Sequence, residues 1–419
     1  MRWYTVDYTK LAEELYFSRE AAEFLGITVQ RLNQLVHEGK IKPLKKNSSG
    51  TIFHIHELNL RKEELLIFDE IKEGGKNGMF EIDTRTKQEA LNFATMMNVL
   101  SYTENKLEPL FEALGEKVDI AAPLDQDDIC NAYAQFFTVE TERIKKEYRA
   151  AYKAFTQLYP TDEIIKRGNK DYPPLLLKTE QAPRFLYIRG KKSLLFEKRT
   201  VALVGSRNAS DAAKENTRRV AEALGKNGII VVSGLAKGID VVAHTTALKN
   251  GYNTIAVIGT NLNQYYPREN REVQKEIERK GLVVSQFSPA NKTQRWFFPL
   301  RNGVMSGLSM ATVIMEAGET SGALKQADFA LKQKRQILIP EKALEMTTIT
   351  WPARYVKRGA ETVRTPKDIL SKLSERSIYN LQEKGKYVQG NLEDYFQKQK
   401  DDVEKGNTNI QLETIELEA

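Results

Sequence analysis

Apolar and polar residues follow different periods along the chain, and the clearest pattern lies between residues 161 and 370. Short runs rich in β-branched and apolar residues alternate there with stretches of helical periodicity; the runs are Thr200–Val204, Gly228–Val232, Asn253–Ile258, Leu282–Ser285, Ala311–Met315 and Arg335–Ile339. Continuous apolar strands separated by amphipathic helices indicate a parallel sheet covered on both faces. We therefore predict an α/β domain over residues 161–370, with a Rossmann-like, doubly wound, mostly parallel sheet.

Two short helical patterns and a hairpin occupy residues 1–60. Ser18 is placed to cap a first helix that ends at Gly26, and Thr28 starts a second that ends at Gly39. A ribbon of Ile41–Leu44 and Thr51–Ile55 follows, around a basic turn. This order predicts a small winged helix-turn-helix and resembles DNA-binding heads of the MerR and excisionase type.

In such a head the second helix faces base edges and the hairpin faces a phosphate. The expected contacts to duplex DNA are Gln30, Arg31, Gln34, Lys45 and Lys46. A protein-interaction module of the same shape is the alternative, because the charge of this head is almost balanced.

The regions on either side of the α/β domain carry no recognisable chemistry. Residues 61–160 have a helical pattern, with an amphipathic helix expected over Thr138–Phe155, and we predict a helical connector or dimerisation element. Residues 371–419 are polar and rich in Lys, Glu and Gln, which predicts a partly disordered tail.

Composition limits the classes of site that the chain can build. Charged residues make up 28% of it, no apolar run reaches the length of a membrane helix, and the N-terminus lacks the apolar region of a signal peptide, so a cytoplasmic protein is expected. Cys130 is the only cysteine, which excludes an internal disulfide and a cysteine-based zinc site. With four scattered histidines, we expect no metal and no cofactor.

Charge is distributed unevenly along the chain. The formal net charge is +7, yet residues 191–367 contain 29 Lys and Arg against 15 Asp and Glu. A basic fold between acidic flanks is typical of a polyanion binder. A solvated basic surface without a partner explains the charge equally well.

Glycine-bearing segments follow the first two predicted strands. Gly205, Ser206 and Arg207 offer a tight turn, a hydroxyl and a planar guanidinium to a phosphate, and Ser210 is placed to cap a helix whose first amides favour an anion. The dinucleotide fingerprint G-x-G-x-x-G is absent, which argues against a nicotinamide or flavin cofactor. Gly205 as a simple turn residue is the alternative.

The second segment places Lys237 between Gly234 and Gly238, and Asp240 and His244 follow one helical turn apart. An acid-base pair is one interpretation, but no nucleophile lies at a suitable spacing. We therefore expect Asp240 and His244 to order the loop through a mutual hydrogen bond. Further along the chain, Ser321 with Gly322 is predicted to cap a helix and to form a second anion site.

Cations and aromatic rings are combined within ten residues after the fourth strand. The set is Lys292, Arg295, Trp296, Phe297, Phe298 and Arg301. Bases of a single strand stack on such rings while cations follow its backbone. We expect a loop here in which either Phe298 or Trp296 stacks a base, with Arg301 and Asn302 helping to order it, and we count Phe298, Arg301 and Asn302 among the candidate binding residues.

These motifs, in this order, resemble the DprA/Smf family of DNA-processing proteins over about residues 164–370. The most specific segments are Gly205–Arg207, the Ser233–Leu248 stretch and Phe298–Asn302. The resemblance implies a non-enzymatic protein that binds single-stranded DNA on a Rossmann-like domain, forms a homodimer and hands the strand to a RecA-type recombinase. It also implies a role in DNA uptake, transformation or recombination.

The chain departs from the family pattern at several positions. Lys237 and Gly303 stand where the family usually has Arg, Leu324–Ala327 replaces a Leu-Ile-Thr-Ala-like run, and Glu341 stands where a glycine is expected. These changes alter the geometry of the binding edge, so strand binding is better supported than recombinase loading.

Two other functions stay open at this stage. A nucleotide sensor or phosphoribohydrolase has a similar sheet, although residues 316–324 lack the double glycine and the catalytic glutamate of those enzymes. A duplex-DNA-binding regulator acting through the N-terminal head is the other.

Overall fold

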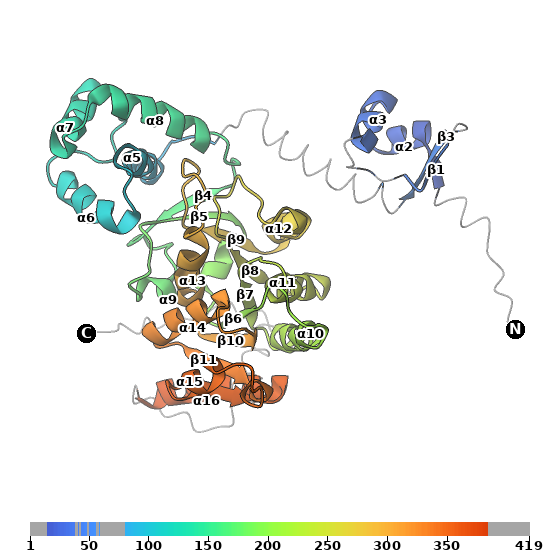
Figure 1. The fold of residues 1–419 in the computed structure, drawn as a ribbon. Helices are drawn as coiled ribbons and strands as arrows, with labels where there is room; N and C mark the ends of the chain where they lie inside the picture. The colour runs from blue at the N-terminus through green and yellow to red at the C-terminus, as the bar shows by residue number, and fades with distance from the viewer. Residues whose placement is uncertain are drawn as a thin grey trace, which may run out of the picture. The chain divides into compact units, whose positions relative to one another are not determined.

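The computed structural model describes residues 15–37, 41, 43–47, 50–55, 58 and 80–383. The chain divides into two compact units, which are considered separately here (Figure 1). The first unit comprises Met1–Ile82 with Thr156–Pro160, and the second comprises Asp83–Phe155 with Thr161–Ala419. The expected closing glycine of the second head helix, Gly39, and most of the predicted tail lie outside the described residues.

The N-terminal unit contains two helices and a three-stranded antiparallel sheet. The helices are α2 (Ser18–Phe24) and α3 (Val29–His37), and the strands are ordered β1 (Leu15–Phe17), β3 (Gly50–His54) and β2 (Lys45–Asn47). A small apolar core joins them, made of Ala21, Ala22, Leu25, Leu32, Leu35, Ile41, Phe53 and Leu58. The assignment of this unit as a DNA-binding winged helix-turn-helix stays a prediction.

Two details of the head differ from the sequence prediction. Phe17, not Ser18, is the N-cap residue of α2, and its backbone amide donates to Glu20 Oε2 at 2.8 Å. Lys45 and Lys46 lie in strand β2 and not in the turn, since the first hairpin strand begins later than expected. Thr28 does precede α3, and its Oγ1 accepts the amide of Arg31 at 3.2 Å.

The second unit begins with four helices that correspond to the predicted helical connector. They are α5 (Arg85–Leu100), α6 (Glu104–Gly115), α7 (Asp127–Phe137) and α8 (Thr141–Phe155), and α8 confirms the amphipathic helix expected there. Buried charges tie them to the sheet, because Arg184 pairs with Glu89 at 2.7 Å and with Glu108 at 3.2 Å. The ends of α5 and α6 are thereby fixed beside the first sheet strands.

A nine-stranded sheet forms the centre of the second unit, in the order β12-β11-β10-β6-β7-β8-β9-β5-β4 (Figure 1). The six predicted strands are confirmed as parallel neighbours; they are β6 (Thr200–Gly205), β7 (Ile230–Ser233), β8 (Thr254–Val257), β9 (Leu282–Ser285), β10 (Ala311–Glu316) and β11 (Gln336–Pro340). Three more strands were not predicted from the sequence. They are β12 (Glu361–Val363), parallel to β11, and the antiparallel strands β5 (Phe185–Gly190) and β4 (Glu163–Lys166).

Helices cover both faces of the sheet and bury a separate apolar core on each. One face carries α10 (Asp211–Lys226), α11 (Ile239–Lys249) and α16 (Pro366–Glu383). The other carries α9 (Pro174–Leu177), α13 (Phe297–Gly307), α14 (Gly322–Lys332) and α15 (Trp351–Val356). Helix α12 (Arg271–Lys280) packs near β8, β9 and β5. The doubly wound α/β fold is confirmed.

The predicted start of the tail at residue 371 is wrong, because helix α16 runs through this position. Residues 371–383 continue this helix, and Ile369 and Leu373 are buried in the core beneath α10. The pattern after residue 370 is polar on average, yet two apolar side chains one helical turn apart are enough to hold the helix against the sheet.

The strand order reverses between β6 and β10, since strands run from β6 through β9 in one direction and from β10 through β12 in the other. Ligands of open α/β sheets bind beyond the carboxyl ends of the strands at such a reversal. The Gly205–Arg207 segment follows β6 and therefore lies at this position.

Candidate nucleic-acid interface

The first loop is shaped by close contacts between protein segments. Ser206 donates its amide to the Glu316 carbonyl at 2.7 Å, and a Cβ added to Gly205 would lie 2.5 Å from the Ile239 side chain. Gly205 is thus required for packing, whether or not a phosphate approaches it. The Arg207 side chain is exposed, and among the described residues no hydrogen bond or ion pair to its guanidinium is found.

The helix N-terminus after this loop already holds an anion of the chain itself. Ser210 caps α10 by accepting the amide of Ala213 at 3.1 Å. The Glu316 carboxylate accepts the Ser210 amide at 3.0 Å and the Ser210 hydroxyl at 2.6 Å. The cap is confirmed, but the predicted free anion site at this helix is occupied by Glu316, to which the sequence analysis gave no role.

The second loop passes directly beside the first. Gly238 has a φ of +75°, and a Cβ there would lie 2.2 Å from the Ser206 carbonyl oxygen. Lys237 is exposed and pairs with Glu269 at 2.6 Å, where each side chain is about half exposed. Exposed pairs of this kind contribute little stability, so Glu269 holds Lys237 only weakly.

Arg301 is buried and bound by the protein, in contrast to Arg207. Its Nη1 donates to the Gly234 carbonyl at 2.6 Å and to the Val257 carbonyl, which joins the ends of β7 and β8. A Cβ on Gly234 would lie 2.2 Å from the same nitrogen. Burial lowers the Arg301 pKa to about 10, although the charge of Asp240 raises it. Arg301 and Gly234 therefore order the loops at this edge of the sheet and are not part of its exposed surface.

Asp240 and His244 do not form the expected mutual hydrogen bond within the described part of the chain. Asp240 Oδ2 accepts the amide of Ala236 at 3.3 Å, which orders the second loop, and burial raises its pKa. His244 Nδ1 instead contacts Thr254 Oγ1 at 2.8 Å and so ties α11 to β8. Burial lowers the His244 pKa to about 3, and the imidazole is neutral at physiological pH.

The aromatic segment begins a helix and is not the loop that the sequence predicted. Helix α13 starts at Phe297, and Pro299 is tolerated because the amides of a first helical turn have no intrahelical partner. The Phe298 ring lies over Gly259 and 5.0 Å from the Tyr266 ring. Phe297 is buried and stacks on Phe287 with ring centroids 3.9 Å apart.

Three rings near this helix keep an accessible surface. Trp296 is 44% exposed, Tyr266 is 51% exposed and Phe298 is partly exposed. Lys292 and Arg295 are exposed just before the helix. Tyr266 was not among the candidates predicted from the sequence. The choice between Phe298 and Trp296 as the stacking residue stays a prediction.

The remaining predicted edge residues lie at the start of α14. Ser321 caps this helix as expected, and its Oγ accepts the amide of Ala323 at 3.3 Å. Asn302 is buried, and its Nδ2 donates to the Gly322 carbonyl at 3.2 Å, which joins α13 to α14. Gly322 has open space around its Cα.

The predicted contacts of the head are exposed, and three of them lie on one face of α3. Gln30, Arg31 and Gln34 are exposed, whereas Leu32 and Leu35 are buried in the small core. Arg31 Nη1 donates to Gln34 Oε1 at 2.7 Å, and Lys45 and Lys46 are exposed on β2.

Metal-ion sites and membrane-spanning helices are absent from the described ranges. Across residues 80–383 and the described parts of the head, there is no group of His, Cys, Asp and Glu side chains arranged to hold a metal ion. None of the helices described there is long and apolar enough to cross a membrane.

Comparison with known proteins gives a consistent match. The family model for DNA recombination-mediator protein A matches residues 163–374. DNA processing protein DprA of Streptococcus pneumoniae is 32% identical over 289 residues, which cover 68% of this chain and 95% of that protein. The Bacillus subtilis protein of the same name is 31% identical over 214 residues, covering 51% of this chain and 72% of the relative.

The fold agrees with this match. The X-ray structure of the Streptococcus pneumoniae protein covers 69% of this chain and 97% of its own, with a TM-score of 0.53 and 28% sequence identity. These relatives are named as DNA processing proteins and not after a catalysed reaction. The chain belongs to the DprA/Smf family of DNA recombination-mediator proteins.

Proposed function

We propose that this protein binds single-stranded DNA at the carboxyl edge of its sheet and acts in DNA processing, uptake or recombination. The observation that carries the proposal is the exposed Arg207 guanidinium, which lies at the strand-order reversal and has no protein partner among the described residues. The loops after β6, β7 and β8 are neighbours in the sheet. Lys237, after β7, adds a cation whose acidic partner is exchangeable.

The aromatic rings favour a single strand over a duplex. Phe298 and Tyr266 lie beyond the end of β8, and Trp296 lies at the start of α13. Partly exposed rings of this kind stack unpaired bases, at about 1 to 3 kcal/mol per base, whereas bases in a duplex are already stacked on one another. Family membership supports DNA as the polyanion.

The test is a competition between a labelled single strand and a duplex of the same sequence. The full chain, Arg207→Ala and the control Arg218→Ala are compared; Arg218 is exposed on α10 and paired with Glu215. We expect preference for the single strand, weakened by Arg207→Ala and unchanged by Arg218→Ala. Absence of single-strand binding, or single-strand binding that Arg207→Ala leaves unchanged, would contradict the proposal.

A second proposal concerns the head, which we infer to contact duplex DNA through α3. The exposed row of Gln30, Arg31 and Gln34 above buried Leu32 and Leu35 supports it. Arg31→Ala is expected to weaken duplex binding and to leave single-strand binding unchanged. Unchanged duplex binding by Arg31→Ala would contradict this inference and favour a protein as the partner of the head.

Delivery of the strand to a RecA-type recombinase by a homodimer is a further part of the proposal, and its support is the family resemblance. Sedimentation of the full chain tests the dimer, and a monomer at micromolar concentration would contradict it. Recombinase filament assembly on coated strands, with and without this protein, tests delivery.

A further inference from the structure

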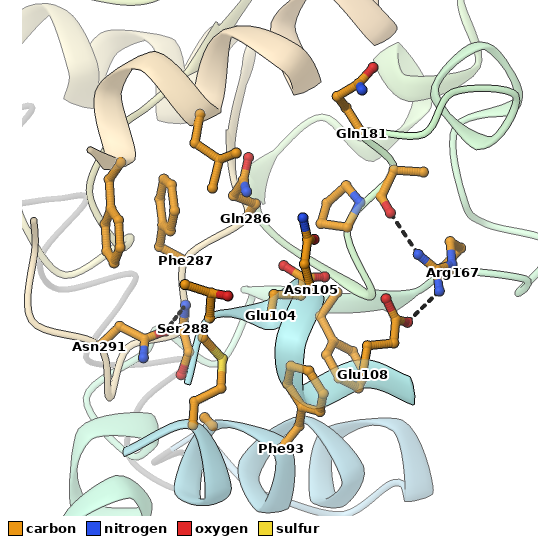
Figure 2. Close-up of a pocket in the computed structure, with 18 of the residues that line it drawn as sticks. Phe93, Glu104, Asn105, Glu108, Arg167, Gln181, Gln286, Phe287, Ser288 and Asn291 are labelled. Atoms are coloured by element: carbon orange, nitrogen blue, oxygen red, sulfur yellow. Dashed lines mark hydrogen bonds and ion pairs between the residues drawn. The ribbon is translucent and has the colours of Figure 1, made fainter. Parts of the chain in front are cut away.

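A cavity of about 410 Å³ lies between the connector helices and the sheet, on the side where α13 begins (Figure 2). Helices α5 and α6 contribute Phe93, Glu104 and Asn105, whereas the sheet and the segment after β9 contribute Tyr187 and Gln286. This volume is within the usual range of small-molecule pockets. Of the two rings predicted from the sequence to stack a base, Trp296 lines this cavity and Phe298 does not.

Seven aromatic rings contribute to the walls of the cavity. The rings belong to Phe93, Phe185, Tyr187, Trp296, Phe297 and Phe329, with Phe287 stacked on Phe297. Aromatic walls favour a flat, polarisable ligand, because offset stacking adds to the area that the ligand buries.

Polar groups are placed among these rings. Gln286 Oε1 is buried and has no hydrogen-bond partner among the described residues. An unpaired buried acceptor costs about 1 to 3 kcal/mol, which a ligand N–H would recover. Glu104 accepts the amide of Arg184, and burial raises the pKa of its carboxyl to about 7, so at neutral pH it is able to donate as well as to accept.

The cavity is reached from the segment that we propose to hold the strand. In the first turns of α13, Phe298 and Arg301 contact the sheet edge, whereas Phe297 and Leu300 line the cavity. Trp296 lines the cavity and is 44% exposed, next to exposed Arg295. A strand that follows these cations therefore passes the cavity.

We propose that this cavity, named here the base pocket, receives one unstacked nucleobase of the bound single strand. The inference rests on the proposed function, since it requires a strand at the sheet edge. Recognition of an extruded base needs aromatic faces for stacking and hydrogen-bonding groups for its edge. The base pocket combines both, with Phe93 and Phe287 as faces and Gln286 with Glu104 at the edge.

Photo-crosslinking locates the base directly. Oligonucleotides that carry 5-iodo-2′-deoxyuridine at successive positions are bound to the full chain, irradiated and mapped by mass spectrometry. We expect one position to crosslink to Phe93 or Tyr187, both of which line the base pocket. Crosslinks confined to Tyr266 and Phe298, with normal strand binding, would overturn the base pocket and leave the proposed function standing. Absence of strand binding would overturn both.

A matched pair of variants separates recognition from folding. Gln286→Leu removes the unpaired acceptor at nearly constant size, and Gln294→Leu makes the same change at an exposed position outside the base pocket. We expect Gln286→Leu to weaken binding of the single strand about fivefold, as for the loss of one hydrogen bond, and to reduce the pocket crosslink in parallel. Equal affinity of the two variants, with unchanged crosslinks, would overturn the inference.

Discussion

Two arginines in family motifs have opposite environments in this protein. Arg207, after β6, is exposed and has no partner among the described residues, whereas Arg301, in α13, is buried and donates to carbonyls at the ends of β7 and β8. Both side chains belong to the same edge of the sheet. Arg207 is therefore available to a ligand, whereas Arg301 fixes the loops at this edge.

The two environments have different energetic consequences. The exposed guanidinium is in contact with solvent and gives little to folding. The buried one has lost its hydration and compensates through hydrogen bonds and the charge of Asp240. Substitution of each arginine is therefore expected to separate stability from binding.

Arg301→Ala is expected to have the largest effect. It leaves the Gly234 and Val257 carbonyls without their donor and Asp240 without its nearby cation. Loss of one partner from such a buried set costs about 3 to 5 kcal/mol of unfolding free energy, measurable by urea denaturation. Arg207→Ala is the control and should stay within about 0.5 kcal/mol of wild type; similar losses in both variants would remove the distinction.

Two glycines at the same edge are expected to differ in their tolerance of a side chain. Gly238→Ala places a Cβ against the Ser206 carbonyl in a left-handed conformation, so we expect a loss of about 2 to 3 kcal/mol. Gly322→Ala, at the open start of α14, should be neutral or slightly stabilising. Thermal unfolding of the two variants distinguishes them, and a tolerated Gly238→Ala would show that the two loops are not held together as described.

Two buried titratable side chains, His244 and Glu104, also predict a pH dependence of stability. The His244 pKa is about 3 in the folded chain against an ordinary value of 6.5, so the unfolded state binds the extra proton first as pH falls. The folded state should lose about 2 kcal/mol between pH 7 and pH 5 through this group. Glu104 acts in the opposite direction, because its raised pKa of about 7 costs stability as pH rises.

His244→Gln isolates the histidine contribution. The stability difference between wild type and this variant should shrink as pH is lowered from 7 to 5, as followed by urea unfolding at each pH. A difference that is constant with pH would mean that His244 is accessible to protons in the folded state.

Arg207→Ala is expected to reduce single-strand affinity about tenfold without unfolding the protein. Loss of one phosphate contact also lowers the slope of log affinity against log salt by about 0.7. Binding measured by fluorescence anisotropy over a salt series gives both quantities. An unchanged slope would place the strand away from the Gly205–Arg207 loop.

Glu269→Gln is expected to have the smallest effect. It frees Lys237 from its exposed ion pair, and we expect single-strand affinity to rise about twofold at low salt, with the gain lost at high salt. Lys237→Ala in the same assay should lower affinity. Identical affinities for wild type and both variants would exclude Lys237 from the interface.

The sheet could be predicted from the sequence where apolar runs were continuous. The six parallel strands are of this type, and their order along the chain fixed the edge at which the glycine-bearing loops gather. Strands β4 and β5 were missed, because prolines mark their segments and because they join the sheet antiparallel, β5 beside β9 and β4 beside β5. The local sequence pattern of such an added edge strand does not differ from that of an irregular segment that precedes the sheet.

The candidate site was predicted in part, and its errors have physical causes. The segment around Phe298 was expected to be a loop but begins α13, where Pro299 is tolerated because a proline in the first turn of a helix costs no hydrogen bond. The burial of Arg301 depends on carbonyls contributed by two distant strands, and the engagement of Ser210 by Glu316 depends on the pairing of β6 with β10. Such contacts arise only from tertiary structure.

In the proposed complex Arg207 contacts the strand and Arg301 does not. Modification of arginines by phenylglyoxal, read by mass spectrometry with and without a thymidine oligonucleotide, tests it directly on the full chain. We predict that Arg207 is modified in the free protein and protected by the strand, and that Arg301 is unmodified in both states. Equal modification of Arg207 in both states, or protection of a reactive Arg301 by the strand, would contradict the account.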